Sequence, residues 1–506
     1  MDFSNAQEAA ESVSGAFFRN ATAARVDTDA VIFDTVSNAH PGVPITTVPE
    51  WSCNLRAYAA AGHATVEALE QSRIDPKIWP ESLRWTIFIP PARRMDGGSG
   101  VVADEVFFES YLYRWDGLTF LVYFADGRDG TMSYPQVRNQ YILGDKAAAR
   151  TLVATVGRWQ SVLHDEVWVF NQGYWRKDPL LYRSILKSRW EDVILDREFK
   201  RDLVDTVQRF FDSREEYTHL GVPWKRGVIF YGPPGNGKTI SIKATMHTLY
   251  SREPAVPTLY VKSLVGFAPP EYSIEAIFQK ARQEAPCYLV FEDLDSLVTD
   301  QVRSFFLNAV DGLSQNDGIF MVGSTNHLDR LDPGIAKRPS RFDRKYLFDN
   351  PNLAQRVKYC HFWQKKLRDN KDLEFPDEIC TAAAKITADF SFAYIQEAFI
   401  SALLEIAREK DGDDHSGEDG VVVSSSSARD DALAEDLREQ WELLDIGGKG
   451  PRDDISSTKD LDDYILWRKL KHQIDLLRKQ ISKKAPAGAG EERKKQRLLD
   501  EQHLYT

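Results

Sequence analysis

One short segment limits the fold of this 506-residue chain more than any other: GPPGNGKT, residues 232–239. The apolar run RGVIFYG leads into it, and a helix-forming sequence beginning TISIKATM continues from it. The segment fits G-x-x-x-x-G-K-[ST] between a strand and a helix, which is the context of a phosphate-binding loop. Its glycines let backbone N–H groups surround a triphosphate at the amino terminus of the helix. We therefore expect nucleotide contacts along the whole loop, at Gly232, Pro233, Pro234, Gly235, Asn236, Gly237, Lys238 and Thr239.

Two side chains of this loop carry specific expectations. The Lys238 ammonium is expected to reach the β- and γ-phosphates, and the Thr239 hydroxyl is expected to ligate Mg²⁺. The loop therefore predicts a chain that binds ATP or GTP together with Mg²⁺.

Carboxylates follow a second apolar run, Tyr288–Phe291, in the sequence CYLVFEDLD, as Glu292, Asp293 and Asp295. Carboxylates at the end of a strand can hold Mg²⁺ and polarise a water molecule. Alone, they could equally be solubilising turn residues. With a phosphate-binding loop upstream, the pattern favours a catalytic role.

The surrounding pattern predicts an α/β core. Between Val193 and Asn350, short apolar strands alternate with helices, which is typical of a parallel sheet covered on both faces. The following segment carries no strand signal and is predicted to be a helical lid. We expect an α+β client or chamber domain, an ATPase subdomain, the lid, an acidic Ser/Gly-rich insertion or linker and a basic helical segment, at residues 1–189, 190–350, 351–409, 410–457 and 458–506.

Local signals support the α+β prediction for the first region. Asp116-Gly117 joins two β-prone runs and predicts a hairpin, because this dipeptide tolerates positive φ. Downstream, Leu152, Val156, Trp159 and Leu163 recur at helical spacing. The sequence DEVWVFNQGYW predicts a further strand and a glycine turn, which we assign to this same domain.

The last region predicts a basic amphipathic helix. Its apolar stripe is expected to dock on the lid or on a neighbouring element, with a nucleic-acid or membrane contact as the alternative. The stripe consists of Leu466, Leu470, Ile474, Leu477 and Ile481.

Composition excludes several classes of protein. The 64 basic and 76 acidic residues give a net charge of −12, which argues against generic binding to nucleic-acid backbones. The four cysteines, Cys53, Cys287, Cys360 and Cys380, lie too far apart to suggest a zinc site or a disulfide framework. No membrane-spanning stretch or secretory signal is recognisable. We expect a cytoplasmic protein, with a nuclear location left open.

These segments together resemble a known family. GPPGNGKT, FEDLD, LNAVDG, STNHLDRLDP and RPSRFDR are similar to the phosphate loop, Walker B strand and second region of homology of the AAA ATPases. They occur in the family's order, and the resemblance covers residues 190–409. It implies the P-loop AAA fold with a helical lid, ATP hydrolysis with Mg²⁺, and a homo-oligomeric ring of six or seven subunits.

A narrower resemblance rests on GVPWKRGVIFYGPPGNGKT, TNHLDRLDP and the order Glu-Asp in the Walker B segment. These are similar to the mitochondrial AAA chaperone family that translocates the Rieske iron–sulfur protein. The run EVWVFNQGYWRKDPLLYRSILKSRWEDVIL extends a weaker similarity back to about residue 105. That family has an amino-terminal membrane helix and this chain shows none, so we expect a soluble relative that acts on an unknown protein client.

The resemblance also implies roles for single residues. Most AAA proteins end the Walker B segment with Asp-Glu, so Glu292 takes the position of the Mg²⁺ ligand and Asp293 that of the general base. Asn326 matches the residue that senses the γ-phosphate and orients water. Arg341 and Arg344 match the arginine fingers that a neighbouring subunit inserts to neutralise charge in the transition state.

Two motifs depart from the family pattern. The lid has Ser391-Phe392-Ala393-Tyr394 where Ser-Gly-Ala-Asp is usual. The pore segment, Leu264-Val265-Gly266-Phe267, places its aromatic residue after the glycine, and Phe267 could instead pack beneath the loop. The second departure weakens the case for threading of a polypeptide and is compatible with handling of folded clients.

Three functions remain open at this point. The first is an ATP-hydrolysing ring that remodels or chaperones proteins. The second is an ATP-binding regulatory scaffold with little hydrolysis, which the order Glu292-Asp293 keeps open. The third is a nucleic-acid remodeller, for which only the basic carboxy-terminal segment speaks.

Overall fold

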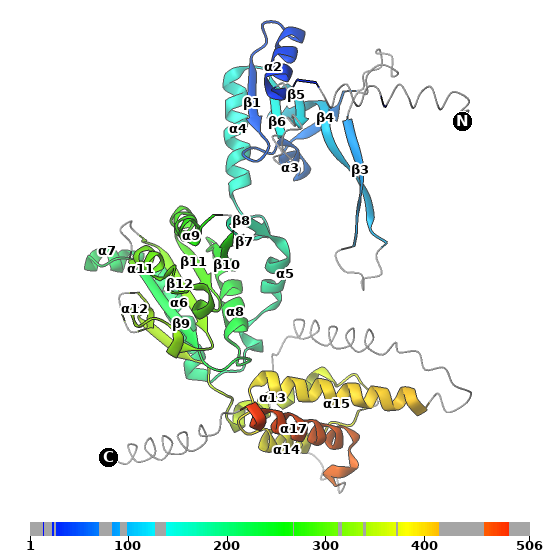
Figure 1. Cartoon of the computed structure of the whole chain (residues 1–506), viewed down its shortest axis with the longest axis vertical. Coiled ribbons are helices and arrows are strands. Elements are labelled where there is room, and N and C mark those ends of the chain that lie inside the picture. Colours follow the sequence, from blue (N-terminus) through cyan, green and yellow to red (C-terminus); the bar gives the residue numbers. More distant parts are fainter. Residues whose placement is uncertain are drawn as a thin grey trace. The chain divides into compact units, whose positions relative to one another are not determined.

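The computed structural model describes residues 14, 23–24, 27–69, 83–91, 99–126, 138–266, 268–311, 316–336, 338, 341–370, 373–413 and 460–484. The chain divides into two compact units, Met1–Val162 and Leu163–Thr506 (Figure 1). No helix in the described part of the chain has both the length and the apolar character needed to cross a membrane.

The first unit is built on an antiparallel six-stranded sheet. Its path is β1-β6-β5-β4-β2, and β3 pairs with β4 beside that path. Among the described residues of this unit, the strands are accompanied by the helices α2 (Thr28–Ala39), α3 (Leu55–Ala60) and α4 (Lys146–Ser161). The strands are β1 (Ile45–Pro49), β2 (Thr65–Ala68), β3 (Leu83–Ile89), β4 (Val101–Trp115), β5 (Leu118–Asp126) and β6 (Arg138–Leu143).

Two local predictions can be followed in this unit. The hairpin at Asp116-Gly117 is confirmed: both residues have positive φ, 50° and 74°, and Trp115 pairs with Leu118 across the turn. In α4, Leu152 and Val156 are buried against the sheet, and Trp159 packs on the same cluster. Leu163 lies beyond the helix, which ends at Ser161.

The second unit is built on a seven-stranded sheet in the order β13-β9-β12-β11-β10-β7-β8. All neighbouring strands are parallel except β7 and β8, which form a hairpin. The sequence predicted a parallel sheet, and the antiparallel strand β8 is the departure from that prediction. The strands are β7 (Val167–Gln172), β8 (Tyr174–Asp178), β9 (Lys225–Tyr231), β10 (Thr258–Gly266), β11 (Cys287–Phe291), β12 (Ile319–Thr325) and β13 (Arg344–Leu347).

Helices cover both faces of this sheet, as Figure 1 shows. One hydrophobic cluster joins the strands to α9 (Pro270–Glu284) and α11 (Arg303–Asp311). The other joins them to α5 (Pro179–Lys187), α6 (Arg197–Asp212) and α8 (Lys238–Tyr250). Burial on both faces explains why every residue of β11 and β12 is buried and why both strands are largely apolar.

The predicted boundary at residues 189/190 is displaced in the structure. We assigned DEVWVFNQGYW to the first domain, but β7 and β8 belong to the seven-stranded sheet. The reason is a long-range parallel pairing, in which Trp168 and Phe170 lie opposite Leu259 and Val261 of β10. The chain accordingly divides after Val162.

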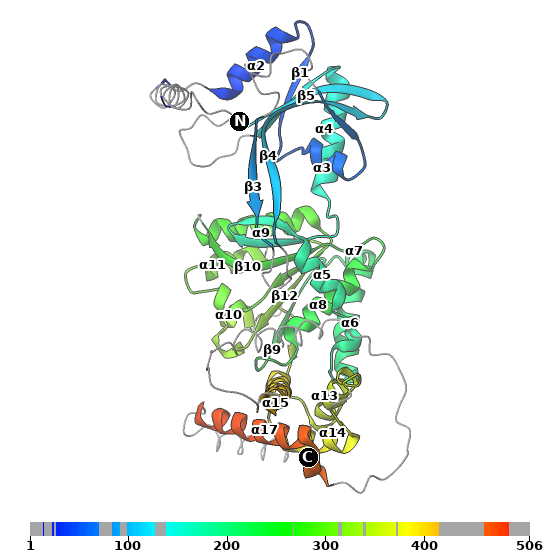
Figure 2. The same cartoon turned by 90° about the vertical axis from the view of Figure 1, so that its right-hand side faces the viewer.

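The carboxy-terminal helices share one hydrophobic cluster. They are α13 (Leu353–Lys366), α14 (Asp377–Ile386), α15 (Phe392–Asp413) and α17 (Ile465–Lys484). Figure 2 shows α17 alongside α15 and α14. Leu466, Leu470 and Ile474 are buried there, so the apolar stripe docks on the predicted lid. The predicted insertion at 410–457 falls almost entirely outside the described residues, because α15 ends at Asp413.

Candidate nucleotide-binding site

The loop between β9 and α8 has a backbone that requires glycine. Gly232 has φ of 135°, and a Cβ placed there would lie 2.3 Å from the backbone oxygen of Phe348. Gly237, with φ of 90°, caps the amino terminus of α8 in the left-handed region. Both conformations are strained for residues with a side chain. The glycines of the motif thus shape the loop that leads into the helix.

A cavity of about 350 Å³ lies at this loop. Its volume is at the lower end of the range typical of small-molecule sites. The residues that line the cavity fall into two sets. A polar group of residues comes from the loop and the strand ends, and an apolar group of residues comes from the segment before α6 and from the lid. The polar group includes Lys238, Thr239, Glu292, Asp293, Ser324 and Asn326, and the apolar group includes Val193, Ile194, Tyr359 and Phe392.

Lys238 is held in place by its own loop. Its Nζ donates to the backbone oxygens of Gly232 at 2.7 Å and Pro233 at 2.9 Å, and the residue is only 8% exposed. Burial lowers the pKa of Lys238, while the neighbouring carboxylates act in the opposite direction. The ammonium lines the cavity, where phosphate oxygens could replace the carbonyls as acceptors.

Glu292 lies on the same face of the sheet as α8. Side chains alternate along a strand, so Glu292 continues the row of Tyr288 and Val290, which pack in the cluster beneath α8. The hydroxyl of Tyr260 donates a hydrogen bond to Glu292 Oε2. Glu292 Oε1 is buried and makes no hydrogen bond to any described residue. Glu292 and Thr239 both line the cavity, and carboxylate and hydroxyl oxygens form a donor set that suits Mg²⁺ bound to a nucleotide.

Asp293 has an unusual backbone. Its φ and ψ are 50° and 51°, and its N–H donates to Ser324 Oγ at 3.3 Å. A left-handed conformation in a residue other than glycine costs about 1–3 kcal/mol, and such residues cluster at functional sites. The turn leaves the Asp293 carboxylate exposed at the cavity. By contrast, Asp295 accepts a hydrogen bond of 2.6 Å from Thr325 Oγ1 and joins the ends of β11 and β12.

The lid reaches the phosphate-binding loop directly. The N–H of Ala393 donates to the Gly235 oxygen at 3.2 Å, and the N–H of Phe392 donates to Asn236 Oδ1 at 3.3 Å. The Phe392 ring meets Tyr359 edge-on, 5.1 Å between centroids. The departure Ser391-Phe392-Ala393-Tyr394 therefore adds an aromatic surface to the cavity.

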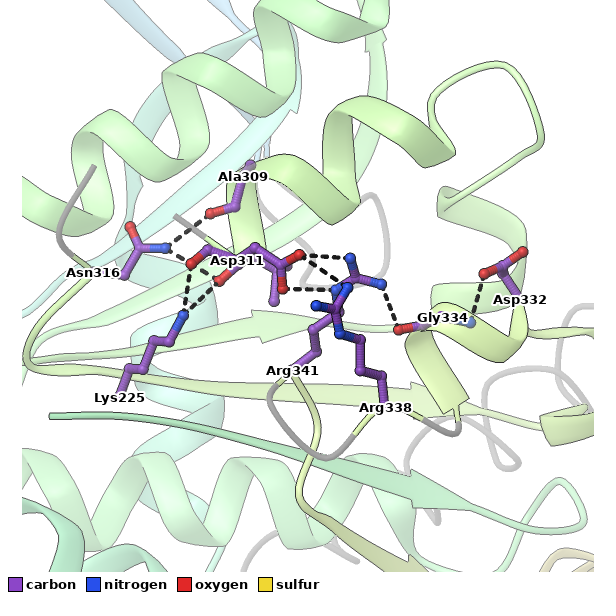
Figure 3. Close-up of polar contacts among 9 residues, drawn as sticks. Lys225, Ala309, Asp311, Asn316, Asp332, Gly334, Arg338 and Arg341 are labelled. Carbon is purple, nitrogen blue, oxygen red and sulfur yellow. Dashed lines mark hydrogen bonds and ion pairs between the residues drawn. The ribbon is translucent and has the colours of Figure 1, made fainter. Parts of the chain in front are cut away.

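Neither of the two predicted finger arginines lies among the described residues that line the cavity. Arg341 is 7% exposed; its Nε and Nη2 donate to Asp311 Oδ1 and Oδ2, and its Nη1 donates to the Gly334 oxygen (Figure 3). The hydrogen bond to Asp311 raises the pKa of Arg341. Arg344 is 43% exposed and donates to both carboxylate oxygens of Asp202 at 3.0 Å. In this conformation, Arg341 is buried and paired within its own chain.

The sequence reasoning passed over Arg338, the first arginine of RPSRFDR. Its side chain is 58% exposed and its Nη1 lies 3.5 Å from Asp311 Oδ2, beside the buried Arg341 (Figure 3). Its position in the same motif was the available signal. Exposure distinguishes the two side chains, and the sequence alone does not report it.

The predicted pore segment is described only in part. Leu264 is buried, whereas Val265 is 74% exposed. A Cβ at Gly266 would lie 2.7 Å from the Cα of Gly173, so glycine permits close approach of β10 to the β7–β8 turn. Phe267 lies outside the described residues.

The fold and the cavity together define an α/β protein of the P-loop nucleoside triphosphatase class. Residues 228–350 match the family described as "ATPase family associated with various cellular activities (AAA)". The matched segment contains the phosphate-binding loop, the Glu292-Asp293 pair, Asn326 and the arginine motif. The chain therefore contains an AAA ATPase domain, which implies binding of ATP and ATPase activity.

Proposed function

We propose that this chain hydrolyses ATP with Mg²⁺ in a ring of identical subunits and uses the energy to remodel or chaperone protein clients. The observation that carries the ATPase part is the gathering of Lys238, Thr239, Glu292, Asp293 and Asn326 around one cavity. The client role rests on the resemblance to the Rieske-translocating chaperone family and on the separate first unit.

Each residue of the site would have its own role in binding and hydrolysis. Lys238 would bind the β- and γ-phosphates, and Thr239 and Glu292 would hold Mg²⁺, which neutralises phosphate charge when bound. The exposed Asp293 carboxylate would accept a proton from the attacking water, and Asn326 would orient that water. Because Asp is one methylene shorter than Glu, Asp293 must lie closer to the water or act through a second one.

The arginine motif would complete the site of the adjacent subunit. Arg338 supplies the exposed guanidinium, and the Arg341–Asp311 pair supports the segment that carries it. Arg344 remains the other predicted finger; reaching a neighbour would require it to leave Asp202. Arginines that act across an interface imply closed symmetry, because each subunit then donates to one neighbour and receives from the other.

The test is ATP hydrolysis per subunit over a range of protein concentrations. A specific rate that rises and then reaches a plateau would support sites shared between subunits. A constant rate from a sample that sizes as a monomer would refute the ring. ATP binding without hydrolysis at any concentration would favour the regulatory scaffold, whose basis is the reversed order Glu292-Asp293.

Two cations of the basic segment that favours the nucleic-acid alternative are paired within the chain. Lys469 of α17 pairs with Glu405 at 2.9 Å and also with Glu409, and Lys471 lies 3.6 Å from Asp462. These cations are partly neutralised within the chain, and the apolar stripe beside them is buried. We therefore retain protein clients as the proposed partners.

A further inference from the structure

The contact between Tyr260 and Glu292 follows from the register of two neighbouring strands. Tyr260 of β10 lies opposite Val290 of β11 in a parallel pairing, so both side chains point to one face. Glu292 follows Val290 by two positions and continues the same face. Tyr260 therefore reaches two residues further along β11, to the next side chain on that face, and its hydroxyl donates to Glu292 Oε2.

The tyrosine is a stable hydrogen-bond donor in this place. Its ring packs on the hydrophobic cluster that joins the sheet to α8. A phenol is protonated at neutral pH, so the Tyr260 hydroxyl can donate to the carboxylate. Of the two oxygens of the Glu292 carboxylate, Oε2 accepts this hydrogen bond, whereas Oε1 is buried without a hydrogen bond to any described residue.

We propose that Tyr260 is a positioning residue, which holds one oxygen of Glu292 so that the other is available to the metal ion of a bound nucleotide. The proposal rests on the nucleotide site assigned above. Glutamate has one more rotatable bond than the aspartate usual at this position, so its carboxylate has more orientations to choose from. A hydrogen bond to one oxygen restricts the orientation of the carboxylate, as hydrogen bonds to metal-ligating side chains commonly do.

The test replaces Tyr260 by phenylalanine, which removes the hydroxyl and keeps the ring. The measurement is Mn²⁺ affinity, by electron paramagnetic resonance, of the full chain with a non-hydrolysable ATP analogue. Tyr260→Phe should weaken Mn²⁺ by about tenfold or more, while analogue affinity in EDTA stays unchanged because Lys238 and the loop are untouched. Tyr250→Phe is the matched control. The Tyr250 ring packs on the same cluster, and its hydroxyl accepts a hydrogen bond from the Thr258 N–H.

A second variant separates positioning from a general loss of structure. Glu292→Asp shortens the side chain, so a carboxylate at this position no longer meets Tyr260. Adding Tyr260→Phe to Glu292→Asp should then weaken Mn²⁺ no further, and a full additional loss would overturn the proposal.

The remaining outcomes of these measurements also decide whether the role of Tyr260 stands. If the wild-type chain shows no metal-dependent nucleotide binding, the proposed function and this inference fail together. If the wild type binds Mn²⁺ with the analogue and Tyr260→Phe binds it equally well, only the role of Tyr260 fails. An equal loss in Tyr250→Phe would likewise overturn it, since that hydroxyl does not touch Glu292.

Discussion

Arg341 and Asp311 form a bidentate ion pair within one subunit, with Nε–Oδ1 and Nη2–Oδ2 distances of 2.8 and 2.6 Å (Figure 3). The pair ties the RPSRFDR motif to the end of α11. Lys225 supports that end, because its Nζ donates to the backbone oxygens of Val310 and Asp311. A cation at a helix carboxy terminus satisfies carbonyls that have no partner within the helix. The motif is therefore anchored by contacts within the chain itself.

Breaking this pair should destabilise the isolated subunit. Arg341→Ala leaves the Asp311 carboxylate and the Gly334 oxygen without their donor, and we expect a loss of about 3 kcal/mol in the free energy of unfolding. Urea denaturation measures it. Arg338→Ala is the control, and because its side chain is 58% exposed it should cost less than about 1 kcal/mol. Equal stabilities for Arg341→Ala and the wild type would contradict the anchoring role.

The same pair predicts a dependence of stability on pH. The hydrogen bond from Arg341 lowers the pKa of Asp311 below its usual value of 3.8, so the folded state favours the charged form. Its contribution is therefore complete above that value and is lost as the pH falls through the lower folded pKa. The stability difference between the wild type and Asp311→Asn should be constant near neutrality and shrink below about pH 4. A difference that grows on acidification would contradict this sign.

Arg338→Ala should abolish catalysis across the interface without affecting nucleotide affinity. If Arg338 acts as a finger, hydrolysis should fall by about 10³-fold or more. The decisive measurement mixes Arg338→Ala subunits with Lys238→Ala subunits, which carry the arginine but cannot bind ATP. Recovery of activity in the mixture would show action in trans, whereas a mixture as inactive as its parts would count against it.

Lys238→Ala should abolish nucleotide binding or nearly so. The side chain is the cation of the phosphate-binding loop, and its pairing with phosphate oxygens has no substitute in alanine. Titration with a fluorescent ATP analogue measures the affinity. Lys243→Ala is a matched control, since Lys243 lies in the same helix but its Nζ donates to Ser184 Oγ. Full binding by Lys238→Ala would remove the basis of the proposed site.

Asp293→Asn should preserve ATP binding and assembly but stop turnover. Asparagine has the shape of aspartate and tolerates the left-handed backbone found there, so the turn should survive. It lacks the charge required to accept a proton from water. Single-turnover hydrolysis measures the loss, and thermal unfolding checks that the fold is intact. Undiminished turnover would refute the assignment of the general base.

Much of the site could be predicted because its signals are local. The loop at residues 232–239 is encoded by glycines at positions with positive φ, directly after a strand and before a helix. The carboxylates follow their strand without a gap, and parallel strands end at one edge of a sheet. The order of these segments along the chain was therefore enough to predict that Lys238, Glu292 and Asp293 lie at one site, and all three line one cavity.

The features that could not be predicted depend on partners far away in the sequence. Strand β7 joins the ATPase sheet because it pairs with β10, about 90 residues later, and no local pattern reports that pairing. Arg338 and Arg341 share one motif and both lie near Asp311, yet Arg341 is buried and Arg338 is exposed. The Tyr260–Glu292 contact likewise needs the register of two strands. Backbone conformation and spacing are local properties of a sequence, whereas burial and pairing arise only when distant segments pack together.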